Sequence, residues 1–242
     1  MRAVITAGGL VDEAFARAIG TPVKALAPFR DGTLLDVALN ACAGAGVDGI
    51  AVVGGDDVAA HLRGTGVRTI PAAADGGTNV ERALDAWPGE RFVYLTSDLP
   101  FVAAPDVRDL IARSERVELA MALASAAAYE ARFPNAPPHG LALGRERIAN
   151  GSAFVVGAAA AAPARALAAR FFAARKNLLK LAALLGPMMC ARFATRTLRI
   201  ADLEAYASRA LGVAVAAVRD CAPGLCYDVD TLAEYEDACA RA

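Results

Sequence analysis

The first half of the chain alternates short apolar runs, rich in β-branched residues, with longer amphipathic stretches. A buried strand followed by a helix is the repeating unit of a mainly parallel sheet that is covered on both faces. We therefore predict an α/β protein with three layers, α/β/α, built on a mostly parallel mixed sheet. Strands are expected at Ala3–Thr6, Gly49–Val53, Val67–Ile70, Phe92–Thr96 and Glu118–Leu123. Helices are expected between them at Thr33–Ala45, Asp57–Arg63, Asn79–Trp87 and Pro105–Arg113.

The second half departs from this alternation from Tyr129 onward. Residues 139–157 indicate short strands, and the dipeptide Asn150-Gly151 within them is typical of a hairpin turn. Further elements are expected as helices at Pro163–Leu185, Ala201–Leu211 and Thr231–Arg241, and as extended segments at Arg192–Arg199 and Val213–Val218. Because no linker is long enough to separate independent folding units, we expect residues 1–242 to form a single domain.

Charge and composition exclude several classes of protein. The chain has 25 Lys and Arg against 26 Asp and Glu, so it has no basic excess for binding nucleic acid or an anionic membrane. No apolar run reaches the ~18 uninterrupted residues of a membrane-spanning helix. The first strand follows Met1 and Arg2 directly, without the features of a secretory leader, which predicts a cytoplasmic protein. The five cysteines form no CxxC pair and the chain has two histidines, so neither a disulfide framework nor a zinc site is expected.

A glycine pair follows the first predicted strand. Gly8 and Gly9 have no side chains that would keep backbone N–H groups away from an anionic ligand. The same pair is also ordinary turn chemistry in α/β proteins. The segment matches neither the GxxxxGK[ST] phosphate loop nor the GxGxxG dinucleotide fingerprint.

Lysine is rare in this chain, and Lys24 stands shortly after the glycine pair. A lysine ammonium is a compact, mobile charge suited to phosphoryl oxygens, although a solvated surface lysine is the alternative. Lys176 and Lys180 follow Arg175 in a predicted helix, where they either contact an acceptor phosphate or form a solvated helix face.

Two groups of carboxylates are candidates for metal binding. Asp98 follows the predicted strand Phe92–Thr96, and ligands of open α/β sheets bind at the carboxyl ends of strands. An aspartate there suits Mg²⁺, which needs few protein ligands, although Asp98 could instead cap the turn before Pro100. Near the C-terminus, Asp228 and Asp230 alternate on an extended segment and can share a face. One of them could instead be the N-cap of the final helix.

Read in order, these motifs resemble the MobA-like nucleotidyltransferases. The matching segments are Ala7-Gly8-Gly9, Arg17, Gly20, Lys24 to Pro28, Ala45 to Asp48, Ile50 to Gly55, Ser97 to Pro100, and Asp228 to Thr231. The resemblance is ordered over residues 1–110 and over the last twenty or so residues. It implies a glycosyltransferase-A type α/β fold and transfer of a nucleotide from an NTP to a phosphorylated acceptor.

The resemblance also implies site residues. Ala7, Gly8 and Gly9 match the triphosphate-binding loop, with Arg17 as its arginine. Lys24 matches the catalytic lysine. The other implied positions are Asp98 and Asp230 as Mg²⁺ ligands, with Asp228 as the less suitable second ligand, Gly77 and Thr78 for the nucleoside, and Asn150 and Gly151, before Ser152, for the acceptor.

The implied organisation divides one domain into two parts. Residues 1–125 form a nucleotide-binding half, and residues 126–242 form an acceptor-binding subregion that ends in the C-terminal metal motif. The implied partners are an NTP and a phosphorylated small molecule, with no nucleic acid and no membrane. The base, the acceptor and the choice between a monomer and a homodimer are left open by the sequence.

Two alternatives remain at this point. Residues Leu10–Ala16 separate Gly9 from Arg17 and lengthen the phosphate loop relative to the family, and the usual serine of the loop is absent. This length favours a noncatalytic nucleotide-binding module as one alternative. A sugar transferase of the same fold is the other, although such enzymes usually carry Asp-x-Asp where this chain has Asp98 alone.

Overall fold

The computed structural model describes residues 1–136, 140–144, 146–174 and 177–242. Within them, an eight-stranded sheet forms the centre of the molecule, in the order β10-β7-β9-β6-β1-β4-β5 with β8 paired to β9. Its strands are β1 Arg2–Thr6, β4 Gly49–Gly54, β5 Arg68–Pro71, β6 Phe92–Thr96, β7 Leu119–Ser125, β8 Leu141–Leu143, β9 Glu146–Val156 and β10 Val215–Val218. β9 runs antiparallel to β6, β7 and β8, whereas the other neighbours are parallel. The predicted mostly parallel mixed sheet is confirmed.

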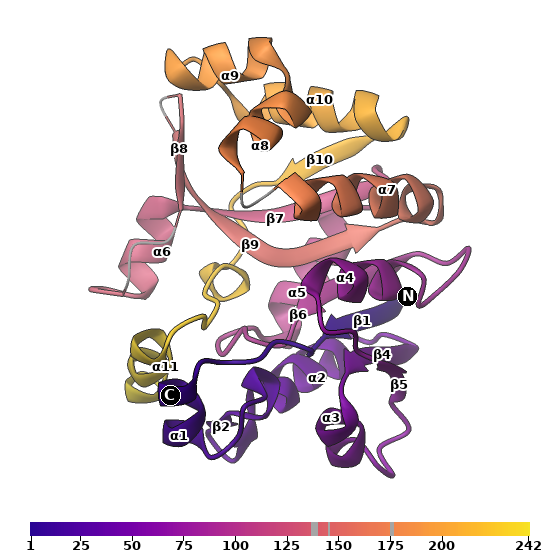
Figure 1. Ribbon diagram of the computed structural model, residues 1–242, viewed down its shortest axis with the longest axis vertical. Coiled ribbons are helices and arrows are strands. Elements are labelled where there is room, and N and C mark those ends of the chain that lie inside the picture. Colours follow the sequence, from indigo (N-terminus) through magenta and orange to yellow (C-terminus); the bar gives the residue numbers. More distant parts are fainter. Residues whose placement is uncertain (137–139, 145, 175–176) are drawn as a thin grey trace.

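Helices cover both faces of this sheet (Figure 1). In chain order they are α1 Glu13–Ile19, α2 Leu34–Gly44, α3 Asp56–His61, α4 Gly76–Leu84, α5 Ala104–Arg113, α6 Ala126–Arg132, α7 Ala158–Ala174, α8 Leu178–Leu185, α9 Pro187–Ala194, α10 Ile200–Leu211 and α11 Leu232–Ala240. Short 3₁₀ turns η1 Lys24–Leu26 and η2 Pro223–Leu225, and a two-stranded hairpin of β2 Pro28–Phe29 and β3 Gly32–Thr33, complete the described elements. None of the described helices has both the length and the apolar character needed to cross a membrane.

Alternating side chains of the central strands divide the core between the two faces. Ile5 and Leu95 belong to a buried cluster with residues of α2 and α5. Their strand neighbours Val4 and Tyr94 belong to another cluster with residues of α4 and α7. Successive residues of a strand point to opposite faces, so these continuous apolar runs are buried from both sides. The three predicted layers follow from this alternation.

The connection between β1 and Lys24 contains a helix where the sequence predicts a lengthened loop. Asp12 caps α1 by accepting a hydrogen bond from Phe15 N at 2.9 Å, and Gly20 ends it in the left-handed conformation with φ 76°. Phe15 and Ile19 are buried on the inner face of α1. The prediction of a loop over Leu10–Ala16 is therefore wrong from Glu13 onward.

The start of α4 also differs from the prediction. The helix begins at Gly76 rather than at Asn79, because Asp75 is its N-cap and accepts from Thr78 N at 2.9 Å. Gly76, Gly77 and Thr78 thus form the first turn of a helix.

The predicted hairpin turn at Asn150-Gly151 is wrong. Both residues lie inside β9, which is an 11-residue strand paired to β6 and β7. A Cβ atom on Gly151 would lie 2.7 Å from the carbonyl oxygen of Ala122, so glycine here allows two backbones to approach closely. The chain turns instead near Gly144, between β8 and β9, next to residue 145, which is outside the described residues.

Two further predictions in the second half are wrong. The helix expected at Pro163–Leu185 is divided into α7, which begins at Ala158 and contains Pro163, and α8. Pro163 removes one backbone hydrogen bond of the helix, and the high helix propensity of the alanine run keeps α7 continuous through it. The segment expected to be extended over Arg192–Arg199 begins as helix α9, because Gly186 and Pro187 start a new helix with proline in its first turn.

Candidate active site

The predicted phosphate loop and the predicted metal-binding loop lie side by side. β1 and β6 are parallel neighbours, with Thr6 opposite Thr96 at their carboxyl ends. Beyond these residues, Ser97 N donates a hydrogen bond to Thr6 O at 3.0 Å. Ala7 N donates to Val53 O on the other side at 2.8 Å. The sheet therefore places residues 7–9 next to residues 97–98.

Both glycines of the first loop are sites of close approach. A Cβ atom on Gly8 would lie 2.8 Å from the side-chain nitrogen of Asn79, and one on Gly9 would lie 3.4 Å from Lys24 Cε. Lys24 N donates a hydrogen bond to Gly9 O at 3.0 Å. The glycine pair thus lets α4 and Lys24 pack against the loop.

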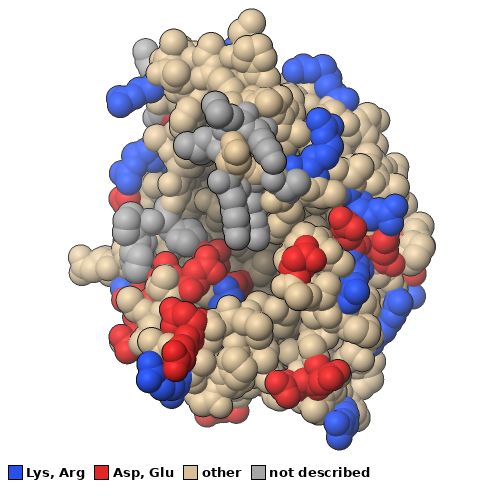
Figure 2. Space-filling model, in the orientation of Figure 1, with Lys and Arg blue, Asp and Glu red and all other residues tan. Residues whose placement is uncertain are grey.

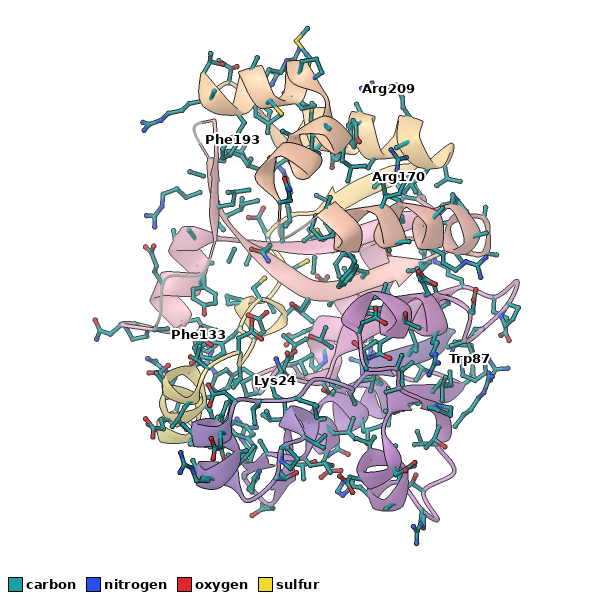
Figure 3. All side chains as sticks on the ribbon, viewed as in Figure 1. Lys24, Trp87, Phe133, Arg170, Phe193 and Arg209 are labelled. Atoms are coloured by element: carbon teal, nitrogen blue, oxygen red, sulfur yellow. The ribbon has the colours of Figure 1, made fainter. Side chains whose placement is uncertain are left out.

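Lys24 lies in the lower half of the view, between elements of the N-terminal and C-terminal parts (Figure 3). Its Nζ contacts Asp98 Oδ2 at 2.5 Å and Asp230 Oδ1 at 2.6 Å. The segment that carries Asp230 is held beside Asp98 by a backbone hydrogen bond, which Val229 N donates to Asp98 O at 3.0 Å. One ammonium therefore joins two carboxylates from distant parts of the chain, and all three are residues that the sequence analysis selected.

The three charged groups differ in exposure. The side chains of Lys24 and Asp98 are 14% and 12% exposed, whereas that of Asp230 is 69% exposed. Burial by itself would lower the pKa of Lys24, but the negative charges of Asp98 and Asp230 and their hydrogen bonds outweigh it and raise the pKa. Lys24 is therefore held as a cation, and the two carboxylates together exceed its charge by one.

Asp98 keeps a free acceptor at the centre of this group. Among the described residues, its buried Oδ1 has no hydrogen-bond partner. A buried anionic oxygen without a donor is costly, so a cation at that point would stabilise it. Carboxylate oxygens suit Mg²⁺, which binds through one or two of them together with substrate phosphates. The described residues contain no cluster of three or more His, Cys, Asp or Glu side chains that could hold a metal ion.

Asp228 and Asp230 point to different partners. Asp228 Oδ2 accepts a hydrogen bond from Ser152 Oγ of β9 at 3.2 Å, while Asp230 binds Lys24. Neither is the N-cap of α11, because Thr231 has that role in a capping box with Glu234.

The other predicted positions are held by contacts of their own. Gly77 packs against α7, where a Cβ atom would lie 3.2 Å from Phe172 Cβ, and Thr78 N is bound to the cap of α4. Asn150 and Gly151 lie in β9, before Ser152. Arg17 is exposed on α1, where its Nε donates to Glu13 O at 3.3 Å. Residues 175–176 and the side chain of Lys180 lie outside the described part of the structure.

Two polar groups near the site are not predicted from the sequence. Asn79 is 6% exposed and bonds the backbone of Ala73 with both ends of its amide, which fixes α4 beside Gly8. Thr96 Oγ1 is buried and, among the described residues, has no hydrogen-bond partner. Its position at the carboxyl end of a predicted strand, two residues before Asp98, is the signal that could have identified it.

Comparison with known proteins identifies a family for most of the chain. Residues 3–184 match the MobA-like NTP transferase domain. A hypothetical transferase from Thermus thermophilus has a similar structure, with 29% identity, a TM-score of 0.84 and 98% of each chain covered. No curated protein gives a significant match.

More distant structures share the fold. A CMP:2-keto-3-deoxy-manno-octonic acid synthetase complexed with CTP is 15% identical with a TM-score of 0.59, covering 99% of this chain and 97% of its own. A Mycobacterium tuberculosis protein complexed with manganese is 19% identical with a TM-score of 0.57, covering 100% and 98%.

Proposed function

We propose an activity for this chain, which belongs to the MobA-like NTP transferase domain family. In the proposal it is a Mg²⁺-dependent enzyme that transfers an NMP from an NTP to a phosphorylated small molecule. The observation that carries this proposal is the contact of the Lys24 ammonium with both Asp98 and Asp230 beside the glycine loop. The three groups combine a mobile positive charge for phosphates with two carboxylates for a divalent cation.

The reaction follows from charges that these residues can neutralise. An oxygen of the acceptor phosphate attacks the α-phosphorus of the NTP, and the bond from that phosphorus to the pyrophosphate leaving group breaks. Lys24 exchanges its carboxylate partners for phosphoryl oxygens and offsets their negative charge. The acceptor is already an anion, so no side chain needs to remove a proton from it.

The loop after β1 contributes through its backbone. In the proposal, the N–H groups of Gly8 and Gly9 bind the triphosphate, with no side chain at the two glycines to block it. The N–H of Ala7 is bonded to Val53 O, so Ala7 contributes by holding the start of the loop against the sheet. We propose that the nucleoside binds at Gly77 and Thr78 and the acceptor at Asn150 and Gly151. Residues 1–125 then form the nucleotide half, and residues 126–242 the acceptor half.

A divalent cation fits the acidic pair. Asp98 and Asp230 would hold Mg²⁺ and the buried Oδ1 of Asp98 would gain a cationic partner. When bound, the ion supplies neutralisation of the negative charge on the α-phosphate. The manganese complex of a protein with the same fold supports a divalent cation.

The helix α1 weakens the case for a noncatalytic module. That alternative rested on a lengthened loop, but the extra residues fold into a capped helix, and Lys24 still lies against Gly9. The sugar-transferase alternative lacks its usual acidic pair at the end of β6, where Asp98 stands without a second aspartate two residues away.

Thermal unfolding with each of the four NTPs, with and without Mg²⁺, tests the proposal without knowledge of the acceptor. A ligand that binds only the folded state at 100 times its Kd adds about 2.7 kcal/mol to the free energy of unfolding. We expect one NTP to raise the Tm with Mg²⁺ and Lys24→Ala to abolish most of that rise. Lys24→Arg should not restore it, because the planar guanidinium does not reproduce a point charge. Four NTPs without effect on wild-type Tm would contradict nucleotidyl transfer.

A further inference from the structure

An apolar cavity of about 600 Å³ lies on the face of the sheet that α7 covers. Its floor is formed by strand residues such as Tyr94, Met121 and Phe154, and its roof by Leu167 and Phe171 of α7 together with side chains of α8 and α10. A cavity of this size is in the range of small-molecule sites. Phe171 is 46% exposed, so the apolar surface continues to the entrance.

One end of the cavity reaches the proposed active site. Thr96, Asn150 and Ser152 are the polar side chains at this end. Thr96 ends β6 two residues before Asp98, and Ser152 donates a hydrogen bond to Asp228, two residues before Asp230. Figure 2 shows that acidic side chains gather beside a hollow on this face. A ligand that fills the cavity can therefore place one end at the reacting phosphates.

The chemistry of the lining determines which ligand fits. No Lys, Arg, Asp or Glu is among the described residues that line the cavity. Beyond the polar side chains at its end, the sugar of a sugar phosphate would bury several hydroxyl groups against a mostly apolar lining, which is unfavourable. A hydrocarbon group would instead gain from leaving water, roughly fourfold in affinity for each buried methylene.

The polar end offers donors suited to a phosphate. Among the described residues, Thr96 Oγ1 is buried without a hydrogen-bond partner, and the hydroxyl can donate to an anionic oxygen. The hydroxyl of Thr96 is thus the side-chain group that would contact the acceptor phosphate.

We propose that the acceptor is the phosphate monoester of a hydrocarbon-rich alcohol, with its chain in the cavity and its phosphate at Thr96. The inference rests on the proposed function and specifies its substrate class. The acceptor oxygen forms a bond to the α-phosphorus, pyrophosphate leaves with the electron pair of the broken bond, and the product is a pyrophosphate that joins the nucleoside to the alkyl chain. No oxidant or reductant takes part.

Isothermal titration of the whole protein with butyl, hexyl and octyl phosphate, below their micelle concentrations, tests the substrate class. The Kd should fall by roughly fourfold per methylene as the chain enters the cavity. Glucose 1-phosphate should bind more weakly than octyl phosphate. A Kd that does not change with chain length, or tighter binding of the sugar phosphate, would overturn the proposal.

Two adjacent alanines of α7 provide matched variants. Ala168 lines the cavity and Ala169 is exposed, so Ala168→Phe should weaken octyl phosphate at least tenfold while Ala169→Phe leaves its Kd unchanged. If Ala168→Phe does not fold, Leu167→Ala widens the same cavity and should shift the preference to longer chains. Equal octyl phosphate binding by wild type, Ala168→Phe and Leu167→Ala would place the ligand elsewhere.

The NTP titration distinguishes this inference from the proposed function. If an NTP with Mg²⁺ raises the Tm but sugar phosphates bind better than alkyl phosphates, the substrate class is wrong and nucleotidyl transfer stands. If alkyl phosphates bind with the expected chain dependence but no NTP has an effect, the cavity assignment is supported and nucleotidyl transfer fails.

Discussion

Asp98 and Asp230 contact the same ammonium, but they are positioned in different ways. Asp98 follows a strand at the centre of the sheet, and its side chain is 12% exposed. Asp230 precedes the last helix, and its side chain is 69% exposed. The sheet fixes the first carboxylate directly, whereas the second depends on where the C-terminal segment docks. The proposed site therefore has two arms: the core arm is Asp98 at the end of β6, and the attached arm is the C-terminal segment of residues 228–230 that carries Asp230.

The attached arm is held by packing between the two ends of the chain. Phe15 of α1 and Tyr235 of α11 have ring centroids 5.3 Å apart. Before α11, Tyr227 is buried in contact with the rings of Phe101 and Phe133, at 5.0 and 4.9 Å between centroids. These contacts place residues 228–230 beside Asp98. The helix that lengthens the phosphate loop thus supports the second carboxylate.

The largest expected effect is on this support. Phe15→Ala removes a side chain that is 1% exposed, and we expect it to lower the free energy of unfolding by about 3–5 kcal/mol. Urea unfolding measures the change. Arg17→Ala, on the exposed face of the same helix, is the control and should stay within about 0.5 kcal/mol of wild type. Equal stability of the two variants would show that α1 does not anchor the C-terminal segment.

The next effect is on the core carboxylate. Asp98→Asn keeps the shape of the side chain but removes its charge, and we expect at least a ~100-fold loss of kcat, the scale of removing one preorganised electrostatic group. Pyrophosphate release measures turnover, and circular dichroism checks that the fold is kept. Normal turnover of the variant at saturating Mg²⁺ would remove Asp98 from the metal site.

The exposed carboxylate should matter less. Water competes for Asp230, so Asp230→Asn should reduce activity by roughly tenfold, and a higher Mg²⁺ concentration should restore most of it. The same increase should not rescue Asp98→Asn. Asp228→Asn is the matched control two residues away, and its dependence on Mg²⁺ concentration should follow wild type. A loss in Asp228→Asn that exceeds the loss in Asp230→Asn would exchange their roles.

The smallest expected effect is a pH profile without a basic limb. The two carboxylates raise the pKa of Lys24 above its ordinary value. The ammonium and its stabilising ion pairs therefore persist until the pH rises through this raised pKa. The kcat/KM, which reports the free enzyme, should stay level from about pH 7 to pH 10. In Asp98→Asn the pKa of Lys24 should fall further than in Asp230→Asn. The negative charge of Asp98 raises this pKa more than that of Asp230 does, so without Asp98 the lowering of the pKa by burial is opposed less. A basic limb below pH 9 in the wild type would contradict the ion pair.

The two arms were also unequally predictable from sequence. Asp98 was located because an apolar run encodes a buried strand, and the residue after such a strand lies at the edge of the sheet. Asp230 was selected from its motif, but the contact with Lys24 spans 206 residues of sequence, and no local pattern specifies it. The sequence predicted which residues to compare, and the fold showed that Asp228 and Asp230 have different partners.

The sequence by itself determined the layered sheet of the first half, its strand ends and the residues of the acidic and glycine loops, because burial and helix periodicity are local patterns. The tertiary structure alone decided that Asn150-Gly151 continues a strand, since pairing of Asn150 with Leu123 of β7, and of β9 with β6 from Ala153 onward, outweighs the turn preference of that dipeptide. It also decided that Leu10–Ala16 enters a helix, because burial of Phe15 against the C-terminal segment stabilises α1. The apolar cavity is likewise a property of the fold, because helices and strands distant in the chain enclose it.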